Sequence, residues 1–425
     1  MQTNIRPNEM DEKKRKEYWA SLALRHCPGL GARSQLRLLL AFGSALAAFE
    51  NFKSWPEFGI SEKIVSEMRR ESWRAPAGEE WKKAGKIAAS AVLWTDDSYP
   101  GQLRNLPDAP ILLYFHGDIS LFKSPGIALI GSRNSSDRGR EVAAWMGRAL
   151  AATGIAVVSG MASGIDASAH QAALQEVGSS IGVLGTGIDL IYPKSNGALF
   201  EQMARNGLLV SEFAPGTPPY GNNFPIRNRL ISGLSLAIVV IEAARKSGSL
   251  ITAKYALDQN REVFAVPGSA LDSHCVGCQD LVRQGARPIF NVDDILHDLA
   301  EILQPYKLAP VPDALCQDDF GPQRSEKNGQ ARKSPSGISL PAEKSGPSEG
   351  KVWENLADDS IVEGLVSADV SRLVVNTLRK NGSMNIDALA GQLDICIEEL
   401  NSILLGLEML GIVKRLPGAR IGLGR

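Results

Sequence analysis

Short apolar runs separated by helical stretches dominate the middle of the chain. The runs are IALI at 127–130, IAVV at 155–158, IGVL at 181–184, LLVS at 208–211, LAIVVI at 236–241, VFAV at 263–266 and PIF at 288–290. Uninterrupted apolar runs of this kind are typical of parallel strands that are buried on both faces. We therefore predict a Rossmann-like, doubly wound α/β domain over 91–303, with its core at 124–303.

Helical spacing of apolar positions marks the segment from Tyr18 to Ile64, which predicts a helical N-terminal domain over 17–90. A tight turn, Pro28-Gly29-Leu30-Gly31, interrupts the segment. This turn is either the hairpin of a helix-hairpin-helix (SAM-like) module or the glycine turn of a small helical bundle. In the first case its backbone N–H groups would approach a nucleic-acid phosphate.

The composition changes after residue 303. Pro, Ser, Gly and Lys dominate, and few residues could form a core, so we predict a flexible linker over 304–364. Three helical stretches and a short β pair follow, which predict a winged-helix domain over 365–425. Its recognition helix would lie near 397–410, where the sequence is acidic and apolar. Such a helix suits contact with protein better than readout of base edges, although wing residues such as Lys414 could touch a DNA backbone.

Composition and charge limit the possible functions. The chain has 425 residues, of which 44% are hydrophobic and 22% charged, and its formal net charge is -1. These values are ordinary for globular proteins, and they offer a nucleic acid no overall attraction, so any DNA binding needs a local positive groove. The polar first twenty residues and the lack of a long apolar run predict a cytoplasmic protein without a membrane partner.

The five cysteines predict reduced thiols, because they are odd in number and scattered through a long chain. Cys275 and Cys278 form a CxxC beside His274, which could be half of a zinc site. A structural zinc needs about four ligands, and no second CxxC is present. We therefore expect ordinary thiols and no bound metal.

Small and polar residues follow several of the predicted strands. They include Gly131-Ser132-Arg133, Ser159-Gly160 and Tyr192-Pro193-Lys194-Ser195-Asn196. The carboxyl ends of parallel strands share one edge of the sheet, where ligands bind. A single loop of this kind would merely permit tight helix packing, but several at one edge predict an anion site of backbone N–H groups, to which Arg133 and Lys194 add full charges.

A second group of donors, Arg227-Asn228-Arg229, precedes the strand at 236–241. Its arginines either form caps and ion pairs or extend the phosphate track, and we predict the latter. The complete predicted phosphate-binding set is Gly131, Ser132, Arg133, Ser159, Gly160, Lys194, Asn196, Arg227, Asn228 and Arg229. A GxGxxG fingerprint and a GxxxxGK[ST] loop are both missing, so we predict no nucleotide cofactor.

Four carboxylate and imidazole side chains near these loops raise the question of catalysis. Asp166 and His170 are four residues apart on one helix face and could act as an acid and a base. With no nucleophile nearby, we predict instead that Asp166 supports the positive helix terminus and that His170 packs or hydrogen-bonds beneath the loop. Glu212 and Glu242 each follow a strand, and we predict that each orients an arginine.

Six sequence blocks closely resemble the DNA-processing protein A (DprA, also called Smf) family of bacterial single-stranded DNA-binding proteins. In order, they are IALIGSR, SGMASGIDASAH, GTGIDLIYPKSN, FPIRNRLISGLS, VIEAARKSGSLITAKYALDQNREVFAVPG and DLVRQGA. The resemblance implies a protein that protects incoming single-stranded DNA during natural transformation and loads the RecA recombinase onto it. It also implies that Arg133 and Lys194 grip the DNA backbone, that the FPIRNR donors line the same pocket, and that the Rossmann-like domain forms a homodimer.

An enzyme is the alternative, because nucleotide-cleaving phosphoribohydrolases carry a phosphate loop at the same sheet edge. Those enzymes have a PGGxGTxxE motif whose glutamate contributes to catalysis, whereas the matching region here reads KSGSLITAKYALD. We therefore predict no catalytic residues. Aromatic residues make up only 6% of the chain, and Tyr192, Tyr220 and Phe224 are those near the predicted groove. Recognition should thus depend mainly on phosphates, with weak sequence preference and a steep salt dependence.

Overall fold

The computed structural model divides into two compact units, Met1–Ser325 and Glu326–Arg425. Each unit has buried hydrophobic residues of its own. The structure describes residues 10–87, 90–269, 272–315, 368–393, 395, 400, 403–404, 407, 413–416 and 420–423.

Helices form the N-terminal part of the first unit, as predicted. They are α1 (Glu12–His26), α2 (Ala32–Phe42), α3 (Ala45–Glu50), η2 (Phe52–Phe58), α4 (Glu62–Arg69) and α5 (Arg74–Lys86). Local signals set their ends: Asp11 caps α1 by accepting from the Lys14 N–H at 2.8 Å, and Gly43 ends α2 in the left-handed region. The indole rings of Trp55 and Trp73 are fully buried among these helices and anchor their core.

A nine-stranded sheet follows, in the order β1-β2-β6-β5-β4-β3-β7-β8-β9. All neighbours from β6 to β9 are parallel, and β1 and β2 add an antiparallel edge. The strands are β1 (Ser90–Leu93), β2 (Leu112–Gly117), β3 (Gly126–Gly131), β4 (Ala156–Ser159), β5 (Ser180–Val183), β6 (Leu208–Ser211), β7 (Ala237–Glu242), β8 (Glu262–Ala265) and β9 (Arg287–Pro288). The predicted large parallel sheet is confirmed, and its winding reverses between β3 and β7.

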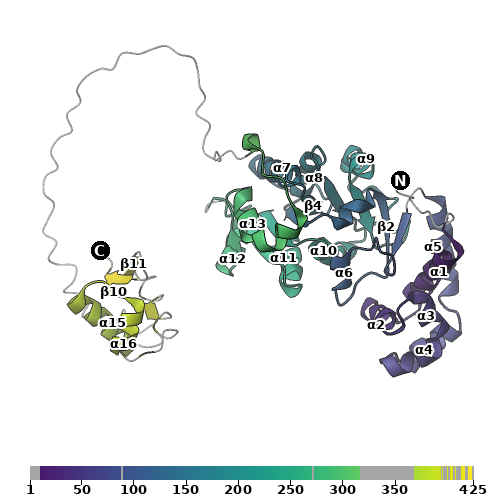
Figure 1. The fold of residues 1–425 in the computed structure, drawn as a ribbon, viewed down its shortest axis with the longest axis horizontal. Helices are drawn as coiled ribbons and strands as arrows, with labels where there is room; N and C mark the ends of the chain where they lie inside the picture. The colour runs from purple at the N-terminus through teal and green to yellow at the C-terminus, as the bar shows by residue number, and fades with distance from the viewer. Residues whose placement is uncertain are drawn as a thin grey trace, which may run out of the picture. The chain divides into compact units, whose positions relative to one another are not determined.

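Both faces of the sheet are covered by helices, which explains why the strands read as continuous apolar runs (Figure 1). Ile127 and Leu129 of β3 pack in the core that includes α7, α8 and α13, whereas Ala128 and Ile130 pack in the core that includes α10, α11 and α12. The helices of this region are α6 (Gly101–Arg104), α7 (Asp137–Ala152), α8 (Ile165–Ala173), α9 (Gly197–Asn206), α10 (Asn223–Gly233), α11 (Ser249–Asp258), α12 (Val276–Arg283), α13 (Val292–Asp298) and α14 (Ala300–Leu303).

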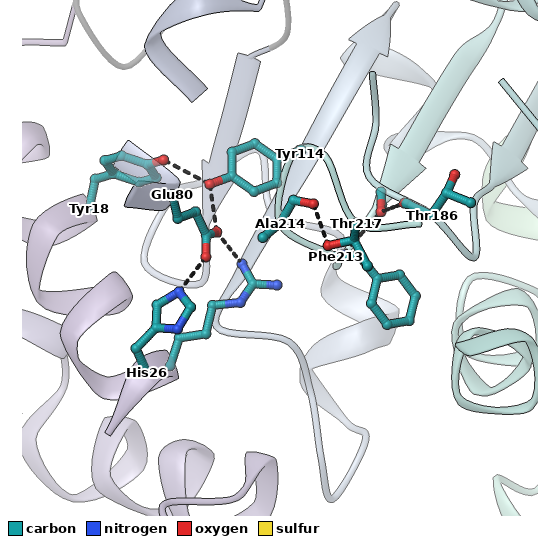
Figure 2. Close-up of polar contacts among 10 residues, drawn as sticks. Tyr18, His26, Glu80, Tyr114, Thr186, Phe213, Ala214 and Thr217 are labelled. Atoms are coloured by element: carbon teal, nitrogen blue, oxygen red, sulfur yellow. Dashed lines mark hydrogen bonds and ion pairs between the residues drawn. The ribbon is translucent and has the colours of Figure 1, made fainter. Parts of the chain in front are cut away.

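A buried polar network joins the N-terminal helices to the sheet (Figure 2). The carboxylate of Glu80 on α5 accepts from Arg25 at 3.0 Å and from the Tyr114 hydroxyl on β2 at 2.7 Å, and it lies 2.6 Å from Nε2 of His26. The Tyr114 hydroxyl also lies 2.8 Å from that of Tyr18. Burial opposes the ionisation of Glu80, but Arg25, His26 and Tyr114 together outweigh it and lower the pKa of this carboxyl. The helices are therefore fixed on the sheet by a satisfied buried charge.

The first unit extends into the segment predicted as a linker. Leu308, Val311 and Leu315 pack against the core beside α7, and the Ala309 N–H donates to the carbonyl of Thr153 at 3.0 Å. Spaced apolar side chains thus hold this stretch on the domain despite its proline-rich composition. Residues 316–364 of the predicted linker lie outside the described residues.

The C-terminal unit contains α15 (Ala368–Asn381), β10 (Met384–Asn385), α16 (Ile386–Leu393), β11 (Val413–Leu416) and β12 (Arg420–Leu423). Its strands form an antiparallel sheet in the order β10-β12-β11. Val374, Leu389 and Ile421 are buried in its core. The predicted recognition helix at 397–410 lies largely outside the described residues. Among the helices that the structure describes, none is long and apolar enough to cross a membrane.

Candidate nucleic-acid interface

A groove of about 690 Å³ lies at the carboxyl ends of β3 and β7, where the winding of the sheet reverses. The loop after β3, the helix α10 and the N-terminus of α11 form its walls. A smaller hollow of about 150 Å³ adjoins it and shares Arg133, Ala162, Tyr192, Phe224 and Arg227. The predicted site residues that line one or both of these spaces are Gly131, Ser132, Arg133, Gly160, Arg227 and Asn228.

Arg133 supplies the exposed positive charge of the groove. Its guanidinium carbon lies 5.0 Å from the ring centroid of Phe224, and the Phe224 ring lies 5.3 Å from that of Tyr192. Among the described residues, no carboxylate forms an ion pair with Arg133. A cation over an aromatic face is oriented but not neutralised, so this guanidinium is available to an anion.

Arg227 lies below the groove and is only 4% exposed. Its Nη1 donates to the carbonyl oxygen of Gly160 at 2.6 Å and to that of Val183, and these bonds tie α10 to the ends of β4 and β5. Burial lowers the pKa of Arg227 to about 10, although the nearby carboxylate of Asp166 opposes the shift. At neutral pH the group is therefore charged and held in place by backbone acceptors.

His170 hydrogen-bonds beneath the loop after β4, as predicted, and Asp166, expected to support the helix terminus, holds the same loop from the first turn of α8. The Asp166 carboxylate accepts from the N–H groups of Gly160 at 3.0 Å and Ala162 at 3.3 Å. The His170 ring is fully buried, with Nδ1 at 2.7 Å from the Ser180 hydroxyl, and burial lowers its pKa to about 3. The imidazole is thus neutral, and both side chains are engaged in holding the loop.

The structure places Arg229 outside the groove. This side chain is 6% exposed and forms ion pairs with Glu212 and, at 3.5 Å, with Asp108. A helix turns about 100° per residue, so two residues after Arg227 the side chain leaves on the opposite side of α10. The prediction that Arg229 extends the phosphate track is therefore wrong, and Glu212 orients an arginine as predicted.

Three other predicted residues do not line the groove either. Ser159 is fully buried and donates to the Leu129 carbonyl at 2.6 Å, so its hydroxyl is not available to a ligand. The Asn196 amide donates to the carbonyl oxygens of Met161 at 3.0 Å and Ala162 at 3.2 Å, which makes it a support of the loop. Lys194 is exposed, at the start of the short helix that follows Pro193.

Glu242 has a different role from the predicted one. Its carboxylate accepts from the N–H of Ser136 at 2.9 Å and from the Ser136 hydroxyl, at the N-terminus of α7. A carboxylate is stabilised there by the helix dipole. The prediction that Glu242 orients an arginine is wrong.

The cysteines of the CxxC are buried and free. Burial raises the pKa of Cys275 to about 11 and that of Cys278 to about 12, so both thiols are protonated at neutral pH. One potential metal-binding atom from each of the side chains of Cys275, Glu242 and Asp272 lies within 4.8 Å of the other two. The Glu242 oxygens are already occupied by Ser136, as described above.

The predicted phosphate-binding set left out one wall of the groove. Ser247, Gly248, Ser249 and Thr252, at the N-terminus of α11, line it together with the predicted residues. Their signal was present, because KSGS is another small-residue loop directly after a buried strand. Phe224 and Tyr192 do line the groove, as their place in the sequence suggested.

Comparisons with known proteins agree with this fold. Residues 90–300 match the family model described as DNA recombination-mediator protein A. Protein Smf of Synechocystis is 35% identical over 334 residues, which cover 76% of this chain and 78% of that protein. DNA processing protein DprA of Bacillus subtilis is 43% identical over 263 residues, or 59% of this chain and 89% of that protein.

A solved structure of DNA processing protein A from Streptococcus pneumoniae superposes with a TM-score of 0.59 at 34% sequence identity, and the match covers 66% of this chain and 97% of that one. The ordered sequence blocks, the shared sheet with its N-terminal helices and the matched relatives lead to one conclusion. The chain belongs to the DNA recombination-mediator protein A family, whose members are also named DprA and Smf.

Proposed function

We propose that this protein binds single-stranded DNA through backbone phosphates in the groove between β3 and β7. The observation that carries the proposal is the Arg133 guanidinium, which is exposed, has no carboxylate partner among the described residues and lies over Phe224. It offers a charge to a phosphate and places that charge beside an aromatic ring. Proteins that bind single strands combine these two features, because every unpaired base has a face that can stack.

A single strand suits this groove better than a duplex does. The Phe224 ring can stack only on a base that is not enclosed in a double helix. The remaining donors are backbone N–H groups and small side chains, which fit phosphate oxygens and do not distinguish one base edge from another. We therefore expect weak sequence preference and binding that weakens steeply with salt.

We further infer that the protein acts as a mediator and not as an enzyme. In this proposal it protects incoming single-stranded DNA during natural transformation in the cytoplasm and loads RecA, as a homodimer through its Rossmann-like domain. Membership of a recombination-mediator family supports the role, and the engagement of Asp166 and His170 in loop support is consistent with the absence of catalysis.

We also propose that the C-terminal unit is a winged-helix domain. The order α15, β10, α16 and the antiparallel hairpin of β11 and β12 supports this assignment. Four positions in the expected third helix, Leu400, Ile403, Leu404 and Leu407, are buried. Because the rest of that helix is acidic and apolar, its partner in this proposal is a protein.

The test is a fluorescence titration of labelled oligo-dT and a matched duplex at two salt concentrations. Wild type should bind the single strand more tightly. Arg133→Ala should weaken this binding about tenfold or more, the usual effect of losing a charged hydrogen bond. Arg205→Ala is the matched control, because it removes the same charge from an exposed residue that does not line the groove.

Equal binding by Arg133→Ala and wild type would overturn the proposal. Displacement of oligo-dT by micromolar AMP would also overturn it. That result would mean that the groove binds a small nucleotide, and it would favour the enzyme alternative. The mediator step has its own readout, the rate at which RecA assembles on oligo-dT. Wild type should raise this rate, and Arg133→Ala should raise it less.

A further inference from the structure

The N-terminus of α11 lines the groove and has no side-chain cap, although the N–H groups of Leu250 and Ile251 donate to the carbonyls of Ser247 and Gly248, each at 3.2 Å. The first turn contains no acidic residue, and the N-cap, Gly248, has no side chain to accept a hydrogen bond. The N–H of Ser249 reaches only the Ser247 hydroxyl, at 3.4 Å, which is long for a hydrogen bond. The positive end of the helix dipole is therefore open to an anion from the groove.

The Thr252 side chain on the same wall is an independent sign of a ligand. It is 2% exposed and lines the groove, and no described residue forms a hydrogen bond with it. Its oxygen is not one of the fully enclosed polar atoms without a partner, so the hydrogen bond that it lacks within the protein can come from a ligand in the groove. The hydroxyls of Ser247 and Ser249, 2.7 Å apart, lie on the same wall.

The charges around this wall favour an anion. Lys246 is exposed, directly before Ser247, and forms no ion pair with any residue that the structure describes. Asp166 is the carboxylate that lines the groove, and its oxygen is already bonded to the N–H groups of Gly160 and Ala162.

We propose that the N-terminus of α11 is a second phosphate subsite of the groove. It rests on the proposed function: Arg133 holds one part of the strand's backbone, and the α11 subsite holds another phosphodiester of the same strand. The phosphate oxygens accept from the N–H of Ser249 and from the hydroxyls of Ser247, Ser249 and Thr252. The strand thereby crosses the switch point of the sheet, from the β3 loop to the β7 loop.

The first test adds a charge and keeps an acceptor at the residue before the N-cap, Gly248. Asp and Asn have nearly the same shape, and each offers the N–H of Ser249 an oxygen in place of the Ser247 hydroxyl, so Ser247→Asp and Ser247→Asn differ mainly in charge. Ser247→Asp should weaken oligo-dT binding about tenfold or more, and its salt slope should be shallower by about 0.7, the value of one lost single-strand phosphate contact. Ser247→Asn should bind like wild type.

The second test removes one hydroxyl without changing the charge. Thr252→Val keeps the shape of the side chain, and because the hydroxyl has no protein partner the variant should fold as stably as wild type or more so. Its oligo-dT binding should fall about fivefold, in line with the loss of one hydrogen bond. Thr252→Ser, which restores the hydroxyl, should recover the binding.

The outcomes separate this inference from the proposed function. Equal binding by Ser247→Asp and Ser247→Asn, or full binding by Thr252→Val, would overturn the α11 subsite. If Arg133→Ala still weakened binding in the same experiment, the groove would remain a single-strand site without this second contact. Failure of wild type itself to bind oligo-dT would overturn both proposals.

Discussion

The guanidinium of Arg133 lies over the ring of Phe224, with its carbon 5.0 Å from the ring centroid, although Arg133 follows β3 and Phe224 lies at the start of α10. Neither element alone forms the pair. The sheet order brings them together, because α10 leads into β7, which lies directly beside β3. The pair places a positive charge and an aromatic surface at the same point of the groove.

Phe224→Leu should weaken oligo-dT binding by about 1–3 kcal/mol, because a base loses its stacking surface and Arg133 loses its support. Phe224→Tyr, which keeps the ring, should retain the binding. A fluorescence titration measures both variants, and urea unfolding checks that the Leu variant is folded. Full binding by Phe224→Leu would show that phosphate contacts alone hold the strand.

Glu212→Ala should lower the free energy of unfolding by about 3 kcal/mol, because it leaves the buried Arg229 with only Asp108 at 3.5 Å. Glu201→Ala is the control: it breaks the pair with Arg205, whose side chains are 65% and 74% exposed, and it should change stability by less than about 1 kcal/mol. Urea denaturation followed by circular dichroism measures both. Equal losses in the two variants would contradict the structural role of the buried pair.

The buried His170 should make stability fall in acid. Burial lowers its pKa from 6.5 to about 3, so below pH 6.5 the unfolded chain takes up a proton that the folded protein does not. The contribution is fully present above pH 6.5 and falls by about 1.4 kcal/mol per pH unit as the pH drops towards 3. His170→Gln should therefore lose less stability between pH 7 and 5 than wild type, as measured by urea unfolding.

The control for this pH dependence is His297→Gln. The side chain of His297 is 90% exposed, so its replacement should leave the wild-type pH profile almost unchanged. If His170→Gln also kept the full wild-type slope, the acid sensitivity would have to come from other groups.

Gly164→Ala should lower the free energy of unfolding by about 1–3 kcal/mol and weaken oligo-dT binding. Gly164 has φ +78°, and an added Cβ would lie 2.5 Å from the Ser132 carbonyl oxygen and 2.7 Å from that of Arg133. The substitution therefore strains the backbone and displaces the loop that carries Arg133. Gly197→Ala, where an added Cβ meets nothing within 4 Å, should leave both stability and binding intact. Similar effects of the two substitutions on binding would contradict this account.

The parallel sheet and the loops at the carboxyl ends of its strands could be predicted because both depend on local sequence patterns. Apolar runs such as IALI indicate burial on both faces of the sheet, and the small residues that follow several of these runs allow the backbone to turn tightly at its edge. Arg133 was found this way, whereas Phe224 was noted as one of the aromatic residues near the predicted groove. The α11 wall carries the same kind of signal in KSGS, but its hydroxyls were not singled out.

Most partners of the charged groups could not be predicted, although Glu212 was expected to orient an arginine. Arg229 pairs with Glu212 and Asp108, and Glu242 bonds to Ser136, whose segments lie far apart along the chain. Arg227 and Arg229 leave α10 on opposite sides because they are two residues apart in one helix. Which of the two faces the groove depends on how α10 is rotated against the sheet, and the sequence does not give that rotation.

The sequence by itself determined the parallel sheet, the loops at its carboxyl edge and the family. Apolar runs and ordered motifs are local features, and they can be read without knowledge of the tertiary structure. Only the tertiary structure decided which of those polar groups face the groove. The order of the strands and the rotation of α10 leave Arg133 open, hold Arg227 beneath the groove and enclose Arg229 in an ion pair. Whether an arginine is free to bind a ligand depends on which residues, distant in the sequence, the fold brings into contact with it. No local sequence pattern gives those contacts.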